Sequence, residues 1–188
     1  MIIVRVISGT HKGQRLYSVP THDTRPTTDK VKEAIFQIIG PYFEGGMVFD
    51  GFAGSGGLGI ECLSRGASEA IFVDKEQKAI KTVKDNLKSL KLEDRAEVYR
   101  TDASRAMKAA SKRGLVFSYV FLDPPYKKFS YEELMENLLE YGLLEKNTLV
   151  VCEHDVSEAL PEKVGALRLF KQEEYGSNIG VAFYQKED

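Results

Sequence analysis

The sequence has few of the residues that would indicate a secreted, metal-binding or membrane-spanning protein. Its only cysteines, Cys62 and Cys152, cannot form a disulfide framework or a four-ligand metal site, and both sit among apolar residues. No apolar stretch approaches the roughly 18 residues that a membrane helix needs, and no signal-peptide pattern opens the chain. We therefore expect two buried thiols in a cytoplasmic protein that needs no metal.

The sequence also lacks a clear excess of either charge. Its 26 Lys+Arg and 28 Asp+Glu give a formal net charge of −2, whereas nucleic-acid-binding proteins are usually basic. The charge is unevenly distributed, however, because residues 1–32 hold six Lys/Arg against two Asp/Glu, and residues 127–188 hold seven against 13. This distribution predicts a basic N-terminal arm that contacts a phosphate backbone through Arg5, Lys12 and Arg15.

The order of apolar segments predicts an α/β fold in the 188 residues. Short apolar runs at 47–50, 70–74, 96–99, 119–122 and 148–152 alternate with segments of helical periodicity, which indicates a parallel sheet covered on both faces. Segments 167–171 and 179–184 add a closing antiparallel hairpin, so the sheet has seven strands. A β-hairpin over residues 2–17 and a helix capped by Thr28 form an extension, and we divide the chain into 1–45 and 46–188.

A glycine-rich loop follows the first strand of this sheet. Gly54, Gly56 and Gly59 match the pattern G-x-G-x-x-G, which is found in tight strand-to-helix turns and in loops that bind a pyrophosphate. Asp50 argues against a pyrophosphate, because a carboxylate directly before the loop would repel it. The same carboxylate suits S-adenosylmethionine, which is cationic and has no phosphate.

Two further carboxylates follow the next strands. Asp74 ends the second strand, where its two oxygens can accept hydrogen bonds from both ribose hydroxyls of a nucleoside cofactor, or it can cap the next helix. Asp102 follows the third strand and can either bond an adenine amino group or serve as a helix N-cap. By itself Asp74 fits NAD as well as S-adenosylmethionine.

The most informative string is Asp123-Pro124-Pro125-Tyr126, which follows the fourth strand. Two prolines stiffen the segment, so that the Asp123 carboxylate and the Pro124 carbonyl form a preorganised pair of acceptors. Such acceptors favour methyl transfer to the exocyclic amine of a base, because they concentrate the nitrogen lone pair and stabilise its developing positive charge. Tyr126 offers a face on which an unstacked base can lie. A structural Pro-Pro turn is the alternative.

These motifs resemble those of class I S-adenosylmethionine-dependent methyltransferases that act on amino groups. Further strings are similar to the RsmD family over essentially the whole chain: Val4-Arg5-Val6-Ile7-Ser8-Gly9, the segment from Thr24 to Glu33, the segment from Phe52 to Glu61, Ser64-Arg65-Gly66-Ala67 and Val151-Cys152-Glu153-His154. The resemblance implies a Rossmann-like methyltransferase fold and N2-methylation of guanine 966 in 16S ribosomal RNA. We expect a monomer that acts on a small-subunit particle, although the sequence does not choose between naked RNA and an assembled particle and does not give the oligomeric state.

The resemblance also implies roles for individual residues. The catalytic set is Asp123, Pro124, Pro125 and Tyr126. The cofactor set is Asp50, Phe52, Gly54, Ser55, Gly56, Asp74, Lys75, Asp102 and Ala103. Together with the charge argument, it gives an RNA-binding set of Arg5, Lys12, Arg15, Arg25, Thr27, Thr28 and Lys127. It makes residues 1–45 the RNA-facing part of the chain.

Several alternatives stay open on the residues alone. The motifs do not choose guanine over adenine or cytosine, nor RNA over DNA, so an adenine-N6 methyltransferase is one alternative. An NAD-dependent oxidoreductase would use the glycine loop and Asp74 but leaves Asp50 and the double proline unexplained. A non-catalytic RNA-binding assembly factor with this fold is a third alternative. His154 is interpreted as a structural or RNA-contacting residue rather than as a catalytic base.

Overall fold

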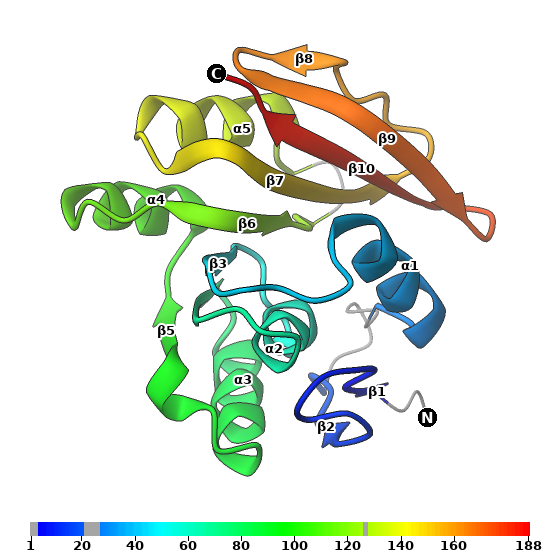
Figure 1. The fold of residues 1–188 in the computed structure, drawn as a ribbon, viewed down its shortest axis with the longest axis vertical. Helices are drawn as coiled ribbons and strands as arrows, with labels where there is room; N and C mark the ends of the chain where they lie inside the picture. Colours follow the sequence, from blue (N-terminus) through cyan, green and yellow to red (C-terminus); the bar gives the residue numbers. More distant parts are fainter. Residues whose placement is uncertain (1–3, 21–26, 126–127) are drawn as a thin grey trace.

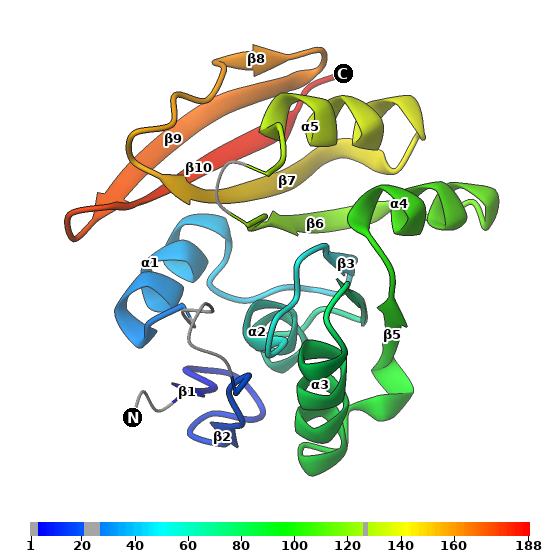
Figure 2. The same ribbon diagram turned by 180° about the vertical axis from the view of Figure 1, so that it is seen from behind.

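The computed structural model describes residues 4–20, 27–125 and 128–188, and Figures 1 and 2 show its ribbon from opposite sides. The main sheet is formed by β3 (Met47–Asp50), β4 (Glu69–Asp74), β5 (Ala96–Arg100), β6 (Phe117–Leu122), β7 (Leu144–Asp155), β8 (Lys163–Val164), β9 (Leu167–Tyr175) and β10 (Ile179–Lys186). The strand order is β5-β4-β3-β6-β7-β10-β9-β8. The first five strands in that order are parallel, and the last three join the sheet in antiparallel fashion.

Helices cover both faces of the sheet, as Figures 1 and 2 show. They are α1 (Asp29–Ile39), α2 (Gly57–Ser64), α3 (Gln77–Ser89), α4 (Ala103–Lys112) and α5 (Tyr131–Glu140), with a short 3-10 turn η1 (Glu93–Arg95) before β5. Apolar side chains of α1, α2 and α3 belong to one buried cluster, and those of α4 and α5 belong to a second. The central strands β3, β4 and β6 are therefore largely buried, which explains their mostly apolar sequences, whereas the edge strand β5 is partly exposed.

The predicted α/β methyltransferase fold is confirmed, with differences in the strands of the C-terminal half. The sheet has eight strands in the described part of the chain, because the two-residue strand β8 pairs with β9 through Lys163 and Val164. Strand β7 is much longer than the predicted 148–152, since its C-terminal part continues in register with β10 as far as Asp155. Strand β9 extends through a charged segment whose side chains are mostly exposed.

The predicted N-terminal hairpin is present but short, with β1 (Val4–Arg5) paired to β2 (Arg15–Leu16). Both views place it beside α1 and at the opposite end of the molecule from β8 (Figures 1 and 2). Its side chains Val4, Val6 and Leu16 are buried in the same cluster as those of α1 and α2. The hairpin is thus packed onto the body of the molecule, and the division at residue 45 stays a sequence prediction.

A buried charged network fastens the hairpin to α2. The Glu61 carboxylate accepts hydrogen bonds from the backbone N–H groups of Ile7 (2.9 Å) and Ser8 (3.1 Å) and an ion-paired bond from Arg65 Nε (2.7 Å). Lys32 Nζ lies 3.8 Å from the same carboxylate and donates to the Arg5 carbonyl at 2.8 Å. Burial lowers the Lys32 pKa, although the Glu61 charge opposes this. Such a network holds a specific docking geometry, because breaking it would leave a charge unpaired inside the protein.

A close backbone approach also fixes the hairpin turn. Gly9 has φ +93°, and a Cβ placed there would lie 1.9 Å from the Ser64 carbonyl oxygen. Only glycine allows the turn to meet the end of α2 in this way.

The two cysteines lie where the sequence places them. Cys62 and Cys152 are buried free thiols, as predicted. Among the described residues, no helix has the length and apolar character needed to cross a bilayer.

Candidate functional site

Acidic residues line the carboxyl edge of the five parallel strands. Along the edge, in the spatial order β5-β4-β3-β6-β7, they are Asp102, Asp74, Asp50, Asp123 and Glu153. Ligands of open α/β sheets bind at this edge. The concentration of negative charge favours a cationic ligand and disfavours a pyrophosphate.

The glycine loop between β3 and α2 uses its glycines for different purposes. Gly54 (φ +56°) and Gly56 (φ +84°) have left-handed backbone conformations, and Gly56 is the N-cap of α2. Gly59 is needed for packing, because a Cβ there would lie 2.4 Å from Phe72 Cε1. The loop therefore brings the N-terminus of α2 close to the strand edge, where the sequence predicts the cofactor.

Asp50 is buried at the end of β3 and holds this loop. Its Oδ2 accepts a hydrogen bond from Gly59 N–H at 3.1 Å. Burial raises the Asp50 pKa to about 7, and the nearby Asp74 charge adds to this effect while the Gly59 hydrogen bond opposes it. A cation near Asp50 would be stabilised by its carboxylate, so the residue fits the cofactor role that the sequence predicts.

Asp74 connects three segments at the next position along the edge. Its Oδ2 accepts from Gly54 N–H and its Oδ1 from Glu76 N–H, both at 2.9 Å. It is Glu76, not Asp74, that occupies the N-cap position of α3. Each carboxylate oxygen has a second lone pair, so the predicted acceptance of ribose hydroxyls is compatible with both backbone bonds.

The other predicted cofactor residues surround these two carboxylates. Asp102 is the N-cap of α4 and accepts from Arg105 N–H at 2.8 Å, which confirms the capping alternative. Ala103 is buried behind it. Phe52 packs edge-on against Phe129 with ring centroids 5.3 Å apart, and so links the glycine loop to the segment after Asp123.

Two members of the cofactor set accept side-chain hydrogen bonds through their backbone carbonyls. The Ser55 carbonyl accepts from Asn86 Nδ2 at 2.9 Å, and the Lys75 carbonyl accepts from Arg100 Nε at 3.2 Å. Asn86 also bonds the backbone of Tyr17, so it connects the glycine loop to the N-terminal hairpin. The side chain of Lys75 is exposed.

The predicted acceptor segment follows β6 at the centre of the edge. Pro124 is buried, whereas Asp123 and Pro125 are exposed. Tyr126 and Lys127 lie outside the described residues. The Asp123 carboxyl reaches solvent, yet the surrounding protein withdraws enough water to raise its pKa well above the ordinary value, and the charges of Glu153 and Asp50 add to the increase.

Glu153 is a site residue that the sequence reasoning did not assign. Residues Leu122 of β6 and Cys152 of β7 are paired in register, so the residues that follow them lie side by side. The carboxyl groups of Asp123 and Glu153 are hydrogen-bonded to each other, and Thr27 Oγ1 donates to Glu153 Oε2 at 3.4 Å. Two carboxyls in contact can share a proton. Burial raises the pKa of Glu153, although the hydrogen bonds with Asp123 and Thr27 oppose this increase.

The neighbouring His154 is buried and hydrogen-bonded. Its Nδ1 lies 2.8 Å from the Asp155 carbonyl and its Nε2 lies 3.4 Å from Gln172 Nε2. A Cβ on Gly180 would lie 2.5 Å from its Cε1, so the imidazole fills the space over that glycine. These contacts support the structural interpretation of His154.

The residues predicted to contact RNA are divided by the structure. Lys12 and Arg15 are exposed on the hairpin, and Arg5 is exposed but paired with Asp29 at 2.8 Å. Thr28 caps α1, while the half-buried Thr27 contacts Glu153 at the strand edge. Arg25 lies outside the described residues.

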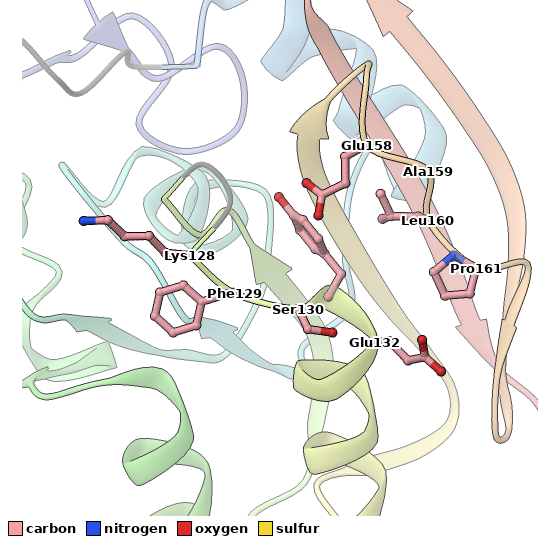
Figure 3. A pocket seen from close by; sticks show the side chains of 9 residues that line it. Lys128, Phe129, Ser130, Glu132, Glu158, Ala159, Leu160 and Pro161 are labelled. Carbon is pink, nitrogen blue, oxygen red and sulfur yellow. The ribbon is translucent and has the colours of Figure 1, made fainter.

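A depression of about 460 Å³ lies beside the segment that follows Asp123 (Figure 3). Lys128 and Phe129 border it on one side, and Leu160 and Pro161 lie on the other (Figure 3). Tyr131 also lines it and donates from its hydroxyl to the Glu153 carbonyl. The depression is therefore next to the carboxyl pair, but none of the acidic residues of the strand edge is among its lining residues.

Comparisons with known proteins agree with this geometry. A family model described as "Conserved hypothetical protein 95" matches residues 4–185. A Bacillus subtilis protein, named provisionally as rRNA methyltransferase YlbH, is 55% identical over 97% of this chain and 99% of its own. Ribosomal RNA small subunit methyltransferase D of Escherichia coli (strain K12) is 32% identical over 98% of this chain and 90% of its own.

A solved structure is similar over nearly the same length. The Escherichia coli protein yhhF, described provisionally as a methyltransferase, has a TM-score of 0.85 against this chain, with 30% identity and 98% of each chain covered.

Proposed function

We propose a function from the premise that this chain belongs to the Conserved hypothetical protein 95 family, the RsmD family of rRNA methyltransferases. Its methyl donor is S-adenosylmethionine, which supplies an activated methyl group on a sulfonium. The substrate that we propose is ribosomal RNA of the small subunit, at the exocyclic N2 amine of guanine 966. The observation that carries this proposal is the rigid acceptor segment Asp123-Pro124 at the centre of the acidic edge.

The residues of the edge fit a cationic nucleoside cofactor. Asp50 lies where its carboxylate can attract positive charge, and Asp74 and Asp102 keep free lone pairs for ribose and adenine groups. The glycine loop brings the backbone N-terminus of α2 close to these carboxylates. NAD is disfavoured here, because its pyrophosphate would meet the Asp50 carboxylate.

On the substrate side, the chain supplies acceptors for an amine. The Asp123 carboxylate and the Pro124 carbonyl accept the N–H groups of the amine, which localises its lone pair for attack on the methyl group. Asp123 then stabilises the positive charge that develops on the nitrogen and takes up the proton that the nitrogen loses. Tyr126 would stack on the base after it leaves its RNA stack. The exposed Lys12 and Arg15 would contact phosphates.

Labelled S-adenosylmethionine provides the test. The purified protein is incubated with deproteinised 16S rRNA and with small subunits that lack the modification, and the labelled nucleoside is identified after digestion. We expect N2-methylguanosine in at least one of the two substrates. Asp123→Ala should reduce the rate by about 10²-fold or more, the usual cost of removing one group that stabilises transition-state charge, while cofactor affinity stays normal.

Two results would refute the proposal. If neither RNA accepts a methyl group, or if the label is found in N6-methyladenosine, the guanine assignment is wrong. If Asp123→Ala binds cofactor and transfers methyl at the wild-type rate, the role given to Asp123 is wrong.

A further inference from the structure

Glu153 is held against the acceptor segment by contacts from three sides. The pairing of Leu122 with Cys152 places it beside Asp123, and the two carboxyl groups are hydrogen-bonded. Thr27 Oγ1 donates to its carboxylate at 3.4 Å. The hydroxyl of Tyr131 donates to its backbone carbonyl. The carboxyl group of Glu153 is thus fixed within reach of whatever Asp123 binds.

We propose that Glu153 is the specificity-determining residue of the site: it accepts a hydrogen bond from the ring N–H next to the target amine and so selects guanine. This inference rests on the proposed function. It adds a residue and a physical reason to a choice of base that the sequence motifs leave open.

The reason lies in the donor pattern of the bases. Guanine presents a ring N1–H directly beside its N2 amine, so its edge offers adjacent donors. Adenine and cytosine place an unprotonated ring nitrogen, an acceptor, beside the amine. Two ionised carboxylates offer acceptors only. Guanine can therefore satisfy Asp123 and Glu153 together, whereas adenine or cytosine would set a lone pair against the Glu153 carboxylate.

The proton shared by the two carboxyls in the free protein has a defined fate in this scheme. When guanine binds, its N–H groups take the place of the shared proton, which leaves to solvent. A site of this kind discriminates strongly, because the wrong base leaves buried polar groups without partners.

A base analogue separates this role from a purely structural one. 2-Aminopurine keeps the amine of guanine, but its N1 carries no proton. Small subunits are reconstituted from 16S rRNA with either guanosine or 2-aminopurine riboside at position 966, and single-turnover methylation is measured. We expect wild-type protein to prefer guanosine by about tenfold or more, the value of one base-specific contact.

The variant Glu153→Gln tests the residue. Its amide can donate to an unprotonated N1, so the preference for guanosine over 2-aminopurine should fall several-fold or reverse. Glu174→Gln makes the same chemical change on the exposed face of β9 and should keep the wild-type preference. A residue that only supported Asp123 would lower both rates equally and leave their ratio unchanged.

Each outcome decides the matter. If wild-type protein methylates guanosine at this position neither in the particle nor in the deproteinised RNA, the proposed function fails and this inference fails with it. If it methylates guanosine and 2-aminopurine equally well, only the inference is wrong, and this comparison holds even if Glu153→Gln does not fold. If Glu153→Gln binds cofactor and keeps the wild-type ratio, the inference is also wrong.

Discussion

At the scale of single residues, the chemistry of the site depends on carboxyl groups that burial and mutual repulsion keep from ionising fully. Asp50, Asp123 and Glu153 all have raised pKa values, and each lies near another acidic residue along the strand edge. A cationic cofactor and an amine that becomes positively charged both relieve this repulsion. The same groups therefore account for binding and for catalysis in the proposed function.

Cofactor binding should depend on pH through Asp50. Its pKa of about 7 means that much of the group is protonated below neutrality in the free protein, whereas the ionised form attracts a cation. We expect the affinity for S-adenosylmethionine to fall by up to about tenfold between pH 8 and pH 6. Calorimetric titration of the protein with S-adenosylmethionine over this pH range measures the affinity. Asp50→Asn should show a weaker, flat profile, and a flat profile in the wild-type protein would contradict the assignment.

Methylation should rise with pH as the Asp123–Glu153 pair ionises. Asp123 must be ionised to accept from the amine. Loss of contact with water raises its pKa most, and the charges of Glu153 and Asp50 add to the increase. Burial raises the pKa of Glu153, and it outweighs the hydrogen bonds from Asp123 and Thr27 and the charge of His154, which lower that pKa. Profiles of kcat/KM against pH should show this rising limb, and Glu153→Gln should move it to lower pH because one negative neighbour is gone. An unmoved limb would show that the pair does not titrate together.

The positions of these carboxylates could be predicted from the sequence, but their pairing could not. Asp50, Asp74 and Asp123 each end or follow an apolar run, and parallel strands bring such positions to one edge. The contact between Asp123 and Glu153 depends on the register of β6 against β7, which the two sequences do not specify. Thr27 likewise reaches Glu153 across 126 positions of sequence.

At the scale of elements, the N-terminal hairpin depends on one close backbone contact. In Gly9→Ala the new methyl group would collide with the Ser64 carbonyl, so the turn would have to move away from α2. We expect faster amide hydrogen exchange in the hairpin and lower RNA affinity, with cofactor affinity unchanged.

Gly13→Ala is the matched control. Gly13 also has a positive φ (+84°), but a Cβ there meets nothing within 4 Å, so this variant carries the backbone strain without the collision. Equal exchange rates in the two variants would show that the contact with Ser64 does not hold the hairpin.

Helix α1 was predictable to within a residue, because Thr28 caps it and Gly40-Pro41 follows it. Strand β8 was not predictable, because two residues are too few to show the alternating apolar pattern of a strand. The strand is defined by its pairing with β9.

At the scale of the whole molecule, the uneven charge needs one correction. The charge count from the sequence includes Lys32 in the basic arm, but in the structure Lys32 is buried beside Glu61. Arg5, also in that count, forms an ion pair with Asp29. Among the described residues of the hairpin, Lys12 and Arg15 are the exposed basic groups whose side chains form no ion pair with another described residue. The basic arm is therefore smaller than the sequence suggests, and an RNA backbone would meet it mainly at these two positions.

Charge reversal tests this surface. Lys12→Glu with Arg15→Glu should weaken RNA binding by about tenfold or more at moderate salt and flatten its salt dependence, because each lost phosphate contact lowers the slope by about one. Cofactor affinity should not change. Lys163→Glu with Lys186→Glu, at the opposite end of the sheet, is the matched control. Equal losses in both double variants would contradict an RNA-facing hairpin.

The most direct test of the central claim is to map the methylated nucleotide in cells. Ribosomal RNA from a strain that lacks this protein is compared with RNA from the same strain carrying the wild-type or the Asp123→Ala gene. The account predicts that N2-methylguanosine at position 966 of 16S rRNA is lost in the deletion strain, returns with the wild-type gene and does not return with Asp123→Ala. A fully modified guanine 966 in the deletion strain, or the loss of a methyl group elsewhere, would contradict it.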